Sequence, residues 1–256
     1  MNYIVFDLEF NQGLGRCSRI NSIKPRCPFE IIQIGAVKLS SELEFVSSFD
    51  RLIKPVIYTD VNPYVREITN ITTEQLLDKK YFNEVYGEFT EFIGHDRNIL
   101  CVWGTADIKE LHRNIAYHGL DASVISREYI NIQMYASKLF NCRSGINIGL
   151  KSAVELLNIP AATDFHNAVN DAYYTAEVFK KIYNDKIQPK IYNPFKYLEP
   201  SRRQRNSEYK QIDTENLIKQ FEKMYNRKMS QEEKSIIKLS YLMGKTNQFQ
   251  LNNKPK

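Results

Sequence analysis

Residues 3–10, with the sequence YIVFDLEF, form the stretch on which the fold and the chemistry of this chain depend. The run is apolar apart from two acids, and it predicts a β-strand that begins close to the first residue. Side chains alternate between the two faces of a strand, so Asp7 and Glu9 point the same way. Two half-buried carboxylates side by side repel each other and lose hydration unless a cation lies between them. The pattern therefore favours a metal site, and the alternative interpretation is an edge strand with one solvated face.

The composition is that of a globular protein. The chain has 256 residues, of which 43% are apolar and 25% are charged, which allows one large domain or one domain with an appendage. The four cysteines contain no C-x-x-C pair, which argues against a zinc site or a disulfide framework: Cys17, Cys27, Cys101 and Cys142. Free thiols in a reducing compartment are the simplest interpretation, so we expect a cytoplasmic protein. We expect neither a signal peptide nor a membrane span, because no apolar run approaches about 18 residues.

The net charge of +5 is unevenly distributed along the chain. Residues 196–256 contain fourteen Lys and Arg against seven Asp and Glu, a net charge of +7. The first 195 residues therefore carry 21 − 23 = −2. A mildly acidic body with a basic extension fits a protein that handles polyanions, and the alternative is a basic solvated surface without a specific partner.

The first third of the chain predicts three strands followed by helices. Apolar runs at residues 30–39 and 45–53 follow the first strand and predict an antiparallel meander. The polar stretch at residues 11–28 is too long for a tight hairpin, so we expect a loop near the acids. A capping-box pattern at residues 72–75 opens a short helix, and apolar residues at helical spacing predict another over residues 82–93.

The middle of the chain alternates strands with helices. A short apolar run at residues 99–103 ends at Gly104, and Thr105 is a plausible N-cap, so Asp107 falls in the first turn of a helix. By itself Asp107 could be an acid favoured by the helix dipole. A further strand is expected at residues 129–134, with helices at residues 135–140, 149–157 and 167–186. This order predicts an α/β fold in which a mixed central sheet is flanked by helices.

The segment His166–Ala172 opens the last of these helices. If His166 stands at the helix entrance and Asp171 lies in its second turn, the imidazole can reach the point at which the carboxylate is aimed. A single histidine before a helix is more often a surface or capping residue, so the spacing from His166 to Asp171 is the informative part.

Together these segments resemble the three motifs of the DnaQ-type 3′–5′ exonucleases of the DEDDh subgroup. The motifs are Asp7-x-Glu9 on the first strand, Asp107 after the Trp103-Gly104 turn, and His166-x-x-x-x-Asp171. Residues 30–37 resemble the second strand of that family, and residues 68–72 resemble its Thr-Gly-Ile-Thr loop. The resemblance covers roughly residues 1–187 and implies an RNase H-like exonuclease fold, with the KapD-like proteins and RNA 3′-end-trimming enzymes as the branch most similar to this chain.

The resemblance implies two divalent ions, Mg²⁺ or Mn²⁺, held by Asp7, Glu9, Asp107 and Asp171. Hard oxygen ligands suit such cations, and a pair of ions suits phosphodiester hydrolysis. In this family pattern His166 is the general base, and these five residues are the expected catalytic set. The implied reaction releases nucleoside 5′-monophosphates from the 3′ ends of single-stranded RNA or DNA.

Two departures from the family pattern affect substrate binding. Phe10 and Asn11 stand where a small residue such as Thr or Ala often follows the acids, and Asn70 stands where Gly is common. Asparagine tolerates a left-handed turn better than most residues. Phe10, Asn11 and Asn70 are therefore candidate substrate contacts, and a preference for RNA rests only on the branch that the chain resembles.

The resemblance does not cover the C-terminal part. We expect an exonuclease domain over residues 1–190 and a basic linker with a helical C-terminal extension over residues 191–256. Arg202, Arg203 and Arg205 are candidate substrate contacts in this linker. Two amphipathic helices follow, and the second is capped by Ser230 and Glu233. We expect their apolar faces to pack against each other or the main domain and not to read nucleic acid.

Three functions from different classes fit the chain. The first is the metal-dependent exonuclease, the second is a non-catalytic regulator of the KapD-like type that binds a protein partner, and the third is a plain nucleic-acid-binding module. A module without catalysis has no chemical reason to keep four converging acids, which repel phosphate. The enzyme is therefore favoured, and the sequence identifies no protein partner.

Overall fold

The computed structural model describes residues 1–13, 27–143, 145–161, 163–194 and 214–245. It divides into two compact units, Met1–Glu199 and Pro200–Lys256. The boundary that the sequence predicted after residue 190 falls too early, because the short strand β6 (Lys190–Ile191) pairs with the sheet of the first unit.

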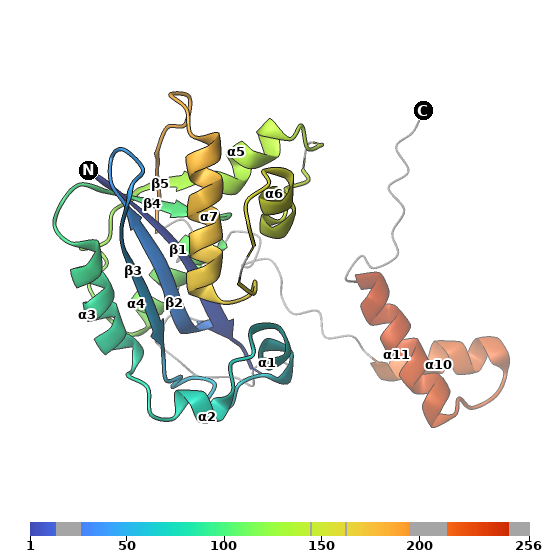
Figure 1. Ribbon diagram of the computed structural model, residues 1–256. Helices are drawn as coiled ribbons and strands as arrows, with labels where there is room; N and C mark the ends of the chain where they lie inside the picture. Colours follow the sequence, from blue (N-terminus) through green and yellow to red (C-terminus); the bar gives the residue numbers. More distant parts are fainter. Residues whose placement is uncertain (14–26, 144, 162, 195–213, 246–256) are drawn as a thin grey trace. The chain divides into compact units, whose positions relative to one another are not determined.

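A mixed six-stranded sheet forms the centre of the first unit (Figure 1). Its spatial order is β3-β2-β1-β4-β5-β6. β1 pairs antiparallel with β2, and β2 with β3, which confirms the predicted meander. β4 and β5 run parallel to β1, and β6 returns antiparallel. The remaining strands are β1 (Asn2–Asn11), β2 (Glu30–Leu39), β3 (Phe45–Leu52), β4 (Asn98–Val102) and β5 (Glu128–Asn131).

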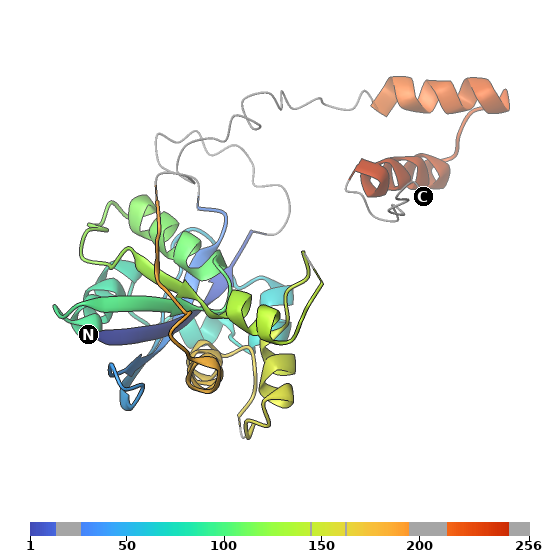
Figure 2. The same cartoon turned by 90° about the horizontal axis from the view of Figure 1, so that it is seen from above.

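Helices cover both faces of the sheet because alternate residues of β1 supply two separate cores. Tyr3 and Val5 face α5 (Ile132–Leu139), α6 (Leu150–Leu156) and α7 (Ala168–Ile182). Ile4 and Phe6 face α3 (Phe82–Ile93) and α4 (Ala106–Tyr117). Seen from above, these two groups of helices lie on opposite sides of the strands (Figure 2). The predicted α/β fold with a mixed sheet flanked by helices is therefore confirmed.

Two short helices pack beside the sheet, near the carboxyl end of β1. α1 (Pro63–Thr69) and α2 (Thr73–Leu76) bury a small third core around Ile32. Thr72 and Gln75 form the predicted capping box at the start of α2. The sequence did not predict α1, which has only seven residues.

Two predicted boundaries differ from the structure. The strand expected at residues 129–134 ends at Asn131, whose side chain accepts a hydrogen bond of 3.2 Å from the backbone N–H of Met134 and so caps α5. The last helix ends at Ile182, four residues before its predicted end at residue 186. Past Asn131 the apolar pattern continues through Ile132 and Met134, whereas residues 184–186 are polar.

The second unit contains two helices, α10 (Thr214–Tyr225) and α11 (Gln231–Lys245). Ser230 and Glu233 exchange the two hydrogen bonds of the predicted cap, at 2.8 and 3.2 Å. α10 has no buried residue. Among the helices that the structure describes, none has the length and apolar character that a bilayer span requires. Cys27, Cys101 and Cys142 are free thiols, whereas Cys17 lies outside the described residues.

Candidate active site

The first two acids lie where β1 extends past its parallel neighbour. β1 pairs with β4 only as far as Val5, so Asp7 and Glu9 project from the part of the strand beyond that pairing. Both side chains are half-buried, and they point to the face of the sheet that carries α7. Ligand sites in open α/β sheets lie at such carboxyl ends of strands.

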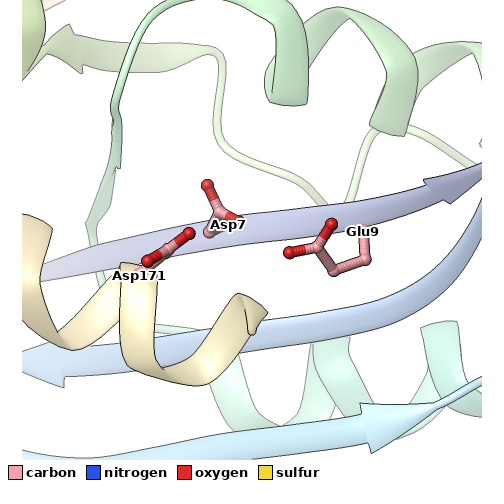
Figure 3. A group of neighbouring side chains, drawn as sticks. All are labelled: Asp7, Glu9 and Asp171. Atoms are coloured by element: carbon pink, nitrogen blue, oxygen red, sulfur yellow. The ribbon is translucent and has the colours of Figure 1, made fainter. Parts of the chain in front are cut away.

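Asp171 brings a third carboxylate to the same place from α7. One ligand oxygen from each of Asp7, Glu9 and Asp171 lies within 4.8 Å of the other two. Figure 3 shows the two β1 acids and the helix acid turned toward a common region. Asn167 caps this helix by accepting a hydrogen bond of 3.2 Å from Val169 N–H, so Asp171 falls in its first turn and not in the predicted second turn.

Asp107 completes the acidic group from the first turn of α4, as the sequence predicted. Its side chain is buried at 6% exposure. It lies close enough for its charge to raise the pKa of both Asp7 and Glu9. The four predicted acids therefore form one electrostatic cluster built from two strand positions and two helix N-termini.

All four carboxyls hold their protons more strongly than free acids do. Burial, followed by the charges of Asp107, Glu9 and Asp171, raises the pKa of Asp7 well above its usual value. Burial and the charges of Asp171 and Asp107 raise the pKa of Glu9 to about 8. Burial raises the pKa of Asp107 to about 7, and burial raises the pKa of Asp171 as well. Such mutual repulsion between buried carboxylates is relieved when a cation binds among them.

The donor set fits divalent cations. All four side chains offer hard oxygen ligands, which Mg²⁺ and Mn²⁺ prefer. Asp171 Oδ1 is buried and, among the described residues, has no hydrogen-bond partner. A buried carboxylate oxygen without a partner is costly, and a bound cation would satisfy it. Asp7, Glu9 and Asp171, with Asp107 beside them, are therefore the residues that would hold metal ions.

His166 stands at the entrance of α7, where the sequence placed it. Its backbone N–H donates a hydrogen bond of 3.1 Å to Asp171 Oδ2, and its side chain is exposed. Its φ of 64° is in the left-handed region, which is uncommon for a residue other than glycine. Both the His166 N–H and the charge of its ring lower the pKa of Asp171, against the larger effect of burial. The imidazole is thus accessible to solvent and within electrostatic reach of the acids.

A residue that the sequence analysis missed allows α7 to approach the sheet. Gly35 lies directly opposite Asp7 in the register of β1 and β2. A Cβ on Gly35 would lie 2.1 Å from both the carbonyl carbon of Ala168 and the nitrogen of Val169, so only glycine fits there. A glycine inside a strand pattern is the signal that could have revealed this contact.

The predicted substrate contacts have different environments. Asn11 is fully buried: its Nδ2 donates to the carbonyls of Tyr58 and Asp60 at 2.8 and 3.0 Å, and its Oδ1 accepts from Asn62 N–H at 2.9 Å. Its side chain therefore holds residues 58–62 in place, and its contact with a substrate stays a prediction.

Phe10 and Asn70 remain candidates for substrate contact. Phe10 is half-buried beside the ring of Phe29, with 6.1 Å between the ring centroids. Asn70 is exposed and ends α1 in the left-handed conformation at φ 57°, as its tolerance of that region predicted. Arg202, Arg203 and Arg205 lie outside the described residues.

A group of acids at the carboxyl end of the central strand of an RNase H-like sheet defines a class of nucleases. The sequence model of the RNase T exonuclease family matches residues 4–179, more than half of this chain. The chain therefore belongs to this exonuclease family, which confirms the predicted resemblance to the DnaQ-type 3′–5′ exonucleases, and it is a hydrolase of that class.

Curated relatives show similarity over the same part of the chain. The PolC-type DNA polymerase III of Thermotoga maritima is 36% identical over 151 residues, covering 59% of this chain and 10% of the polymerase. The PolC-type DNA polymerase III of Thermotoga petrophila is 34% identical over 160 residues, covering 59% of this chain and 10% of that polymerase. The chain thus spans about a tenth of the length of these relatives.

Solved structures with lower sequence identity share the fold. The nuclease domain of 3′hExo, described as a DEDDh family member bound to rAMP, is 19% identical, with a TM-score of 0.62, and the match covers 75% of this chain and 96% of that domain. Exonuclease I of E. coli in complex with a dT13 oligonucleotide is 16% identical, with a TM-score of 0.56, and the match covers 71% and 40%.

Proposed function

We propose that this chain hydrolyses the terminal phosphodiester bond at the 3′ end of single-stranded nucleic acid and releases nucleoside 5′-monophosphates one at a time. The observation that carries the proposal is the convergence of Asp7, Glu9 and Asp171 within 4.8 Å, with the buried Asp107 beside them. The proposed cofactors are two divalent ions, Mg²⁺ or Mn²⁺, with these acids as ligands. When bound, such ions supply Lewis-acid activation and neutralise developing charge.

The side chains have separate roles in the proposed reaction. The four acids would hold the cations, which would neutralise the charge of the scissile phosphate. A water oxygen attacks the phosphorus atom while the bond to the 3′ oxygen breaks. His166, exposed at the entrance of α7, takes the proton from that water. The departing 3′ oxygen gains a proton from solvent, which balances the hydrolysis.

RNA is the proposed substrate in preference to DNA. Similar structures include a 3′-exonuclease that recognises the histone mRNA stem-loop and an exonuclease I bound to a DNA oligonucleotide, so the fold accommodates either polymer. The preference rests on the resemblance to the RNA-trimming branch of the family. The half-buried Phe10, in the position that follows the acids, is the candidate for contact with the terminal sugar.

A digestion assay with oligomers labelled at either end tests the proposal. The purified full-length chain is incubated in Mn²⁺ with RNA and DNA of the same sequence, each labelled at the 3′ or the 5′ end. We expect the 3′ label to appear at once as a mononucleotide and the 5′ label to pass through a ladder of shortening products. Internal fragments from the 3′-labelled oligomer would contradict the proposed direction.

The same assay separates the enzyme from the non-catalytic alternatives. A regulator that binds a protein, or a module that only binds nucleic acid, would leave all four labelled oligomers intact with Mg²⁺ and with Mn²⁺. A module that only binds nucleic acid would still retard the oligomers in a gel. Faster release from RNA than from DNA supports the proposed preference, and equal rates contradict it.

A further inference from the structure

Gln33 on β2 is a buried polar side chain for which the sequence analysis predicted no role. It is 2% exposed and lies opposite Glu9 in the register of β1 and β2. Its Oε1 accepts a hydrogen bond of 3.2 Å from the backbone N–H of Ala168. Ala168 is the first residue of α7, so this bond joins the sheet beside Glu9 to the helix that carries Asp171.

Asp50 determines which end of the Gln33 amide faces the helix. Gln33 Nε2 donates to Asp50 Oδ1 at 2.8 Å and lies 3.5 Å from Asn167 Oδ1. An ionised carboxylate can only accept hydrogen bonds, so Nε2 must point to Asp50 and Oε1 must point to Ala168. The exposed Asp50 on β3 therefore holds the amide in the orientation that α7 needs.

The bond from Ala168 to Gln33 satisfies one of the backbone N–H groups at the start of α7, which the residues of α7 and its N-cap satisfy only in part. The first N–H groups of a helix have no partner inside it. Asn167 Oδ1 accepts from Val169 N–H, and the Asn167 carbonyl accepts from Asp171 N–H at 2.9 Å, whereas Ala168 N–H bonds to Gln33. The Gln33 contact is thus the side-chain bond that ties the first turn of α7 to β2, next to the close approach at Gly35.

We infer that Gln33 is a positioning residue that sets the distance between the acid of α7 and the acids of β1, and so tunes metal binding. The inference rests on the proposed metal-dependent function of these acids. The hydrogen bonds of Gln33 that the structure describes go to Asp50, Asn167 and Ala168, so it acts through the placement of Asp171 and His166. Removing a side chain that supports a metal ligand typically lowers metal affinity or activity by about 10- to 100-fold.

The test compares three variants of the full-length chain. Gln33→Leu removes both polar ends of the amide. The double variant Gln33→Glu with Asp50→Asn keeps an oxygen for Ala168 N–H and supplies an amide donor at position 50 to face the other oxygen. Asn98→Leu is the matched control, since Asn98 is another buried amide, and its bonds to the carbonyls of Gly94 and Asp96 lie at the opposite end of the sheet. Mn²⁺ affinity is measured by calorimetry on the metal-free proteins, and the turnover number and KM are measured separately on a 3′-labelled oligomer.

We expect Gln33→Leu to bind Mn²⁺ about 10- to 100-fold more weakly and to lose turnover with little change in KM. The double variant Gln33→Glu with Asp50→Asn should recover most of both. Asn98→Leu should lower the melting temperature as Gln33→Leu does and leave Mn²⁺ affinity unchanged. Wild-type Mn²⁺ affinity in a folded Gln33→Leu protein would overturn the inference. If the wild type binds Mn²⁺ but cleaves nothing, the proposed function fails, and the affinities still decide the role of Gln33.

Discussion

At the scale of single residues, the site depends on carboxyl groups whose burial and mutual repulsion are unfavourable in the metal-free protein. The half-buried Asp7 lies near the buried Asp107, and Asp171 Oδ1 has no hydrogen-bond partner in the part of the chain that the structure describes. A purely structural cluster of this kind would weaken the fold with no compensation. The arrangement is explained if the acids bind cations, because each unfavourable feature is then relieved.

His166 gives the clearest prediction about a single side chain. His166→Ala should lower turnover by about 10²- to 10⁴-fold, the usual effect of removing a general base, with little change in Mn²⁺ affinity. The acid limb of the pH–rate profile should lose its histidine-like step. The control is His95→Ala, because His95 is exposed in the turn that precedes β4. A His166→Ala enzyme with the parent rate and pH profile would make His166 a structural residue.

At the scale of the elements, the site exists because α7 crosses β2 at very short range. Gly35 removes the side chain that would keep the helix away, and Gln33 binds the first turn of the helix to the strand. The carboxylate of Asp171 therefore reaches the β1 acids from an element more than 160 positions away in the sequence.

Gly35→Ala should damage catalysis through this packing contact. The added methyl would meet the backbone at 2.1 Å, which cannot move as a flexible side chain could, so α7 must shift. We expect a loss of about 1–3 kcal/mol in unfolding free energy and about a 10²-fold loss of turnover. Gly87→Ala in the middle of α3 is the control, because nothing lies within 4 Å of the Cβ that this change adds. Its free energy of unfolding should rise by about 0.5–1 kcal/mol. Parent turnover in Gly35→Ala would show that the close approach is dispensable.

The sequence predicted the elements whose pattern is local and missed those that depend on distant contacts. The first two strands and α3 were predicted closely because their apolar periodicity and bounding residues are local signals. The five catalytic candidates were found because their order and separation resemble the motifs of a known exonuclease family. The structural role of Asn11 and the contact of Gln33 with Ala168 could not be predicted, because both depend on partners at least 47 positions away.

At the scale of the whole molecule, the raised pKa values link stability to pH. A carboxyl whose folded pKa is about 8, as for Glu9, binds its proton more tightly in the folded state than in the unfolded state, where the pKa is about 4.3. The metal-free protein should therefore lose stability as pH rises between these two values. The lowered pKa of the buried His112, about 4, acts in the opposite direction only below about pH 6.5.

Melting temperatures measured in chelator at pH 7 and pH 8.5 test this linkage. We expect the metal-free protein to lose on the order of 1 kcal/mol of stability across this window, since one pKa unit corresponds to about 1.4 kcal/mol. Glu9→Gln should show a smaller loss, and saturating Mg²⁺ should abolish it. A wild-type protein whose metal-free stability is constant or rises from pH 7 to 8.5 would contradict the raised pKa values.

The basic extension gives a prediction about substrate capture. If Arg202, Arg203 and Arg205 contact phosphates, replacing all three by Ala should weaken binding to every sequence and flatten the salt dependence of log K by up to about 2 units. Turnover at saturating substrate should stay the same. A variant without Lys181, Lys186 and Lys190, three exposed cations at and beyond the C-terminal end of α7, controls for net charge. An unchanged salt slope in the arginine variant would favour packing or protein binding by the extension.

The cleavage rate of Asp7→Asn tests the central claim most directly. The change removes one charge from the cluster and keeps the volume of the side chain, so the fold should persist, and metal-free stability should stay equal or rise because repulsion among the acids falls. We predict no detectable release of mononucleotide from a 3′-labelled oligomer in Mn²⁺, while Asp185→Asn, at an exposed acid beyond the end of α7, cleaves at the parent rate. Near-normal turnover of a folded Asp7→Asn protein in Mn²⁺ would contradict a mechanism in which these acids hold the catalytic metal ions.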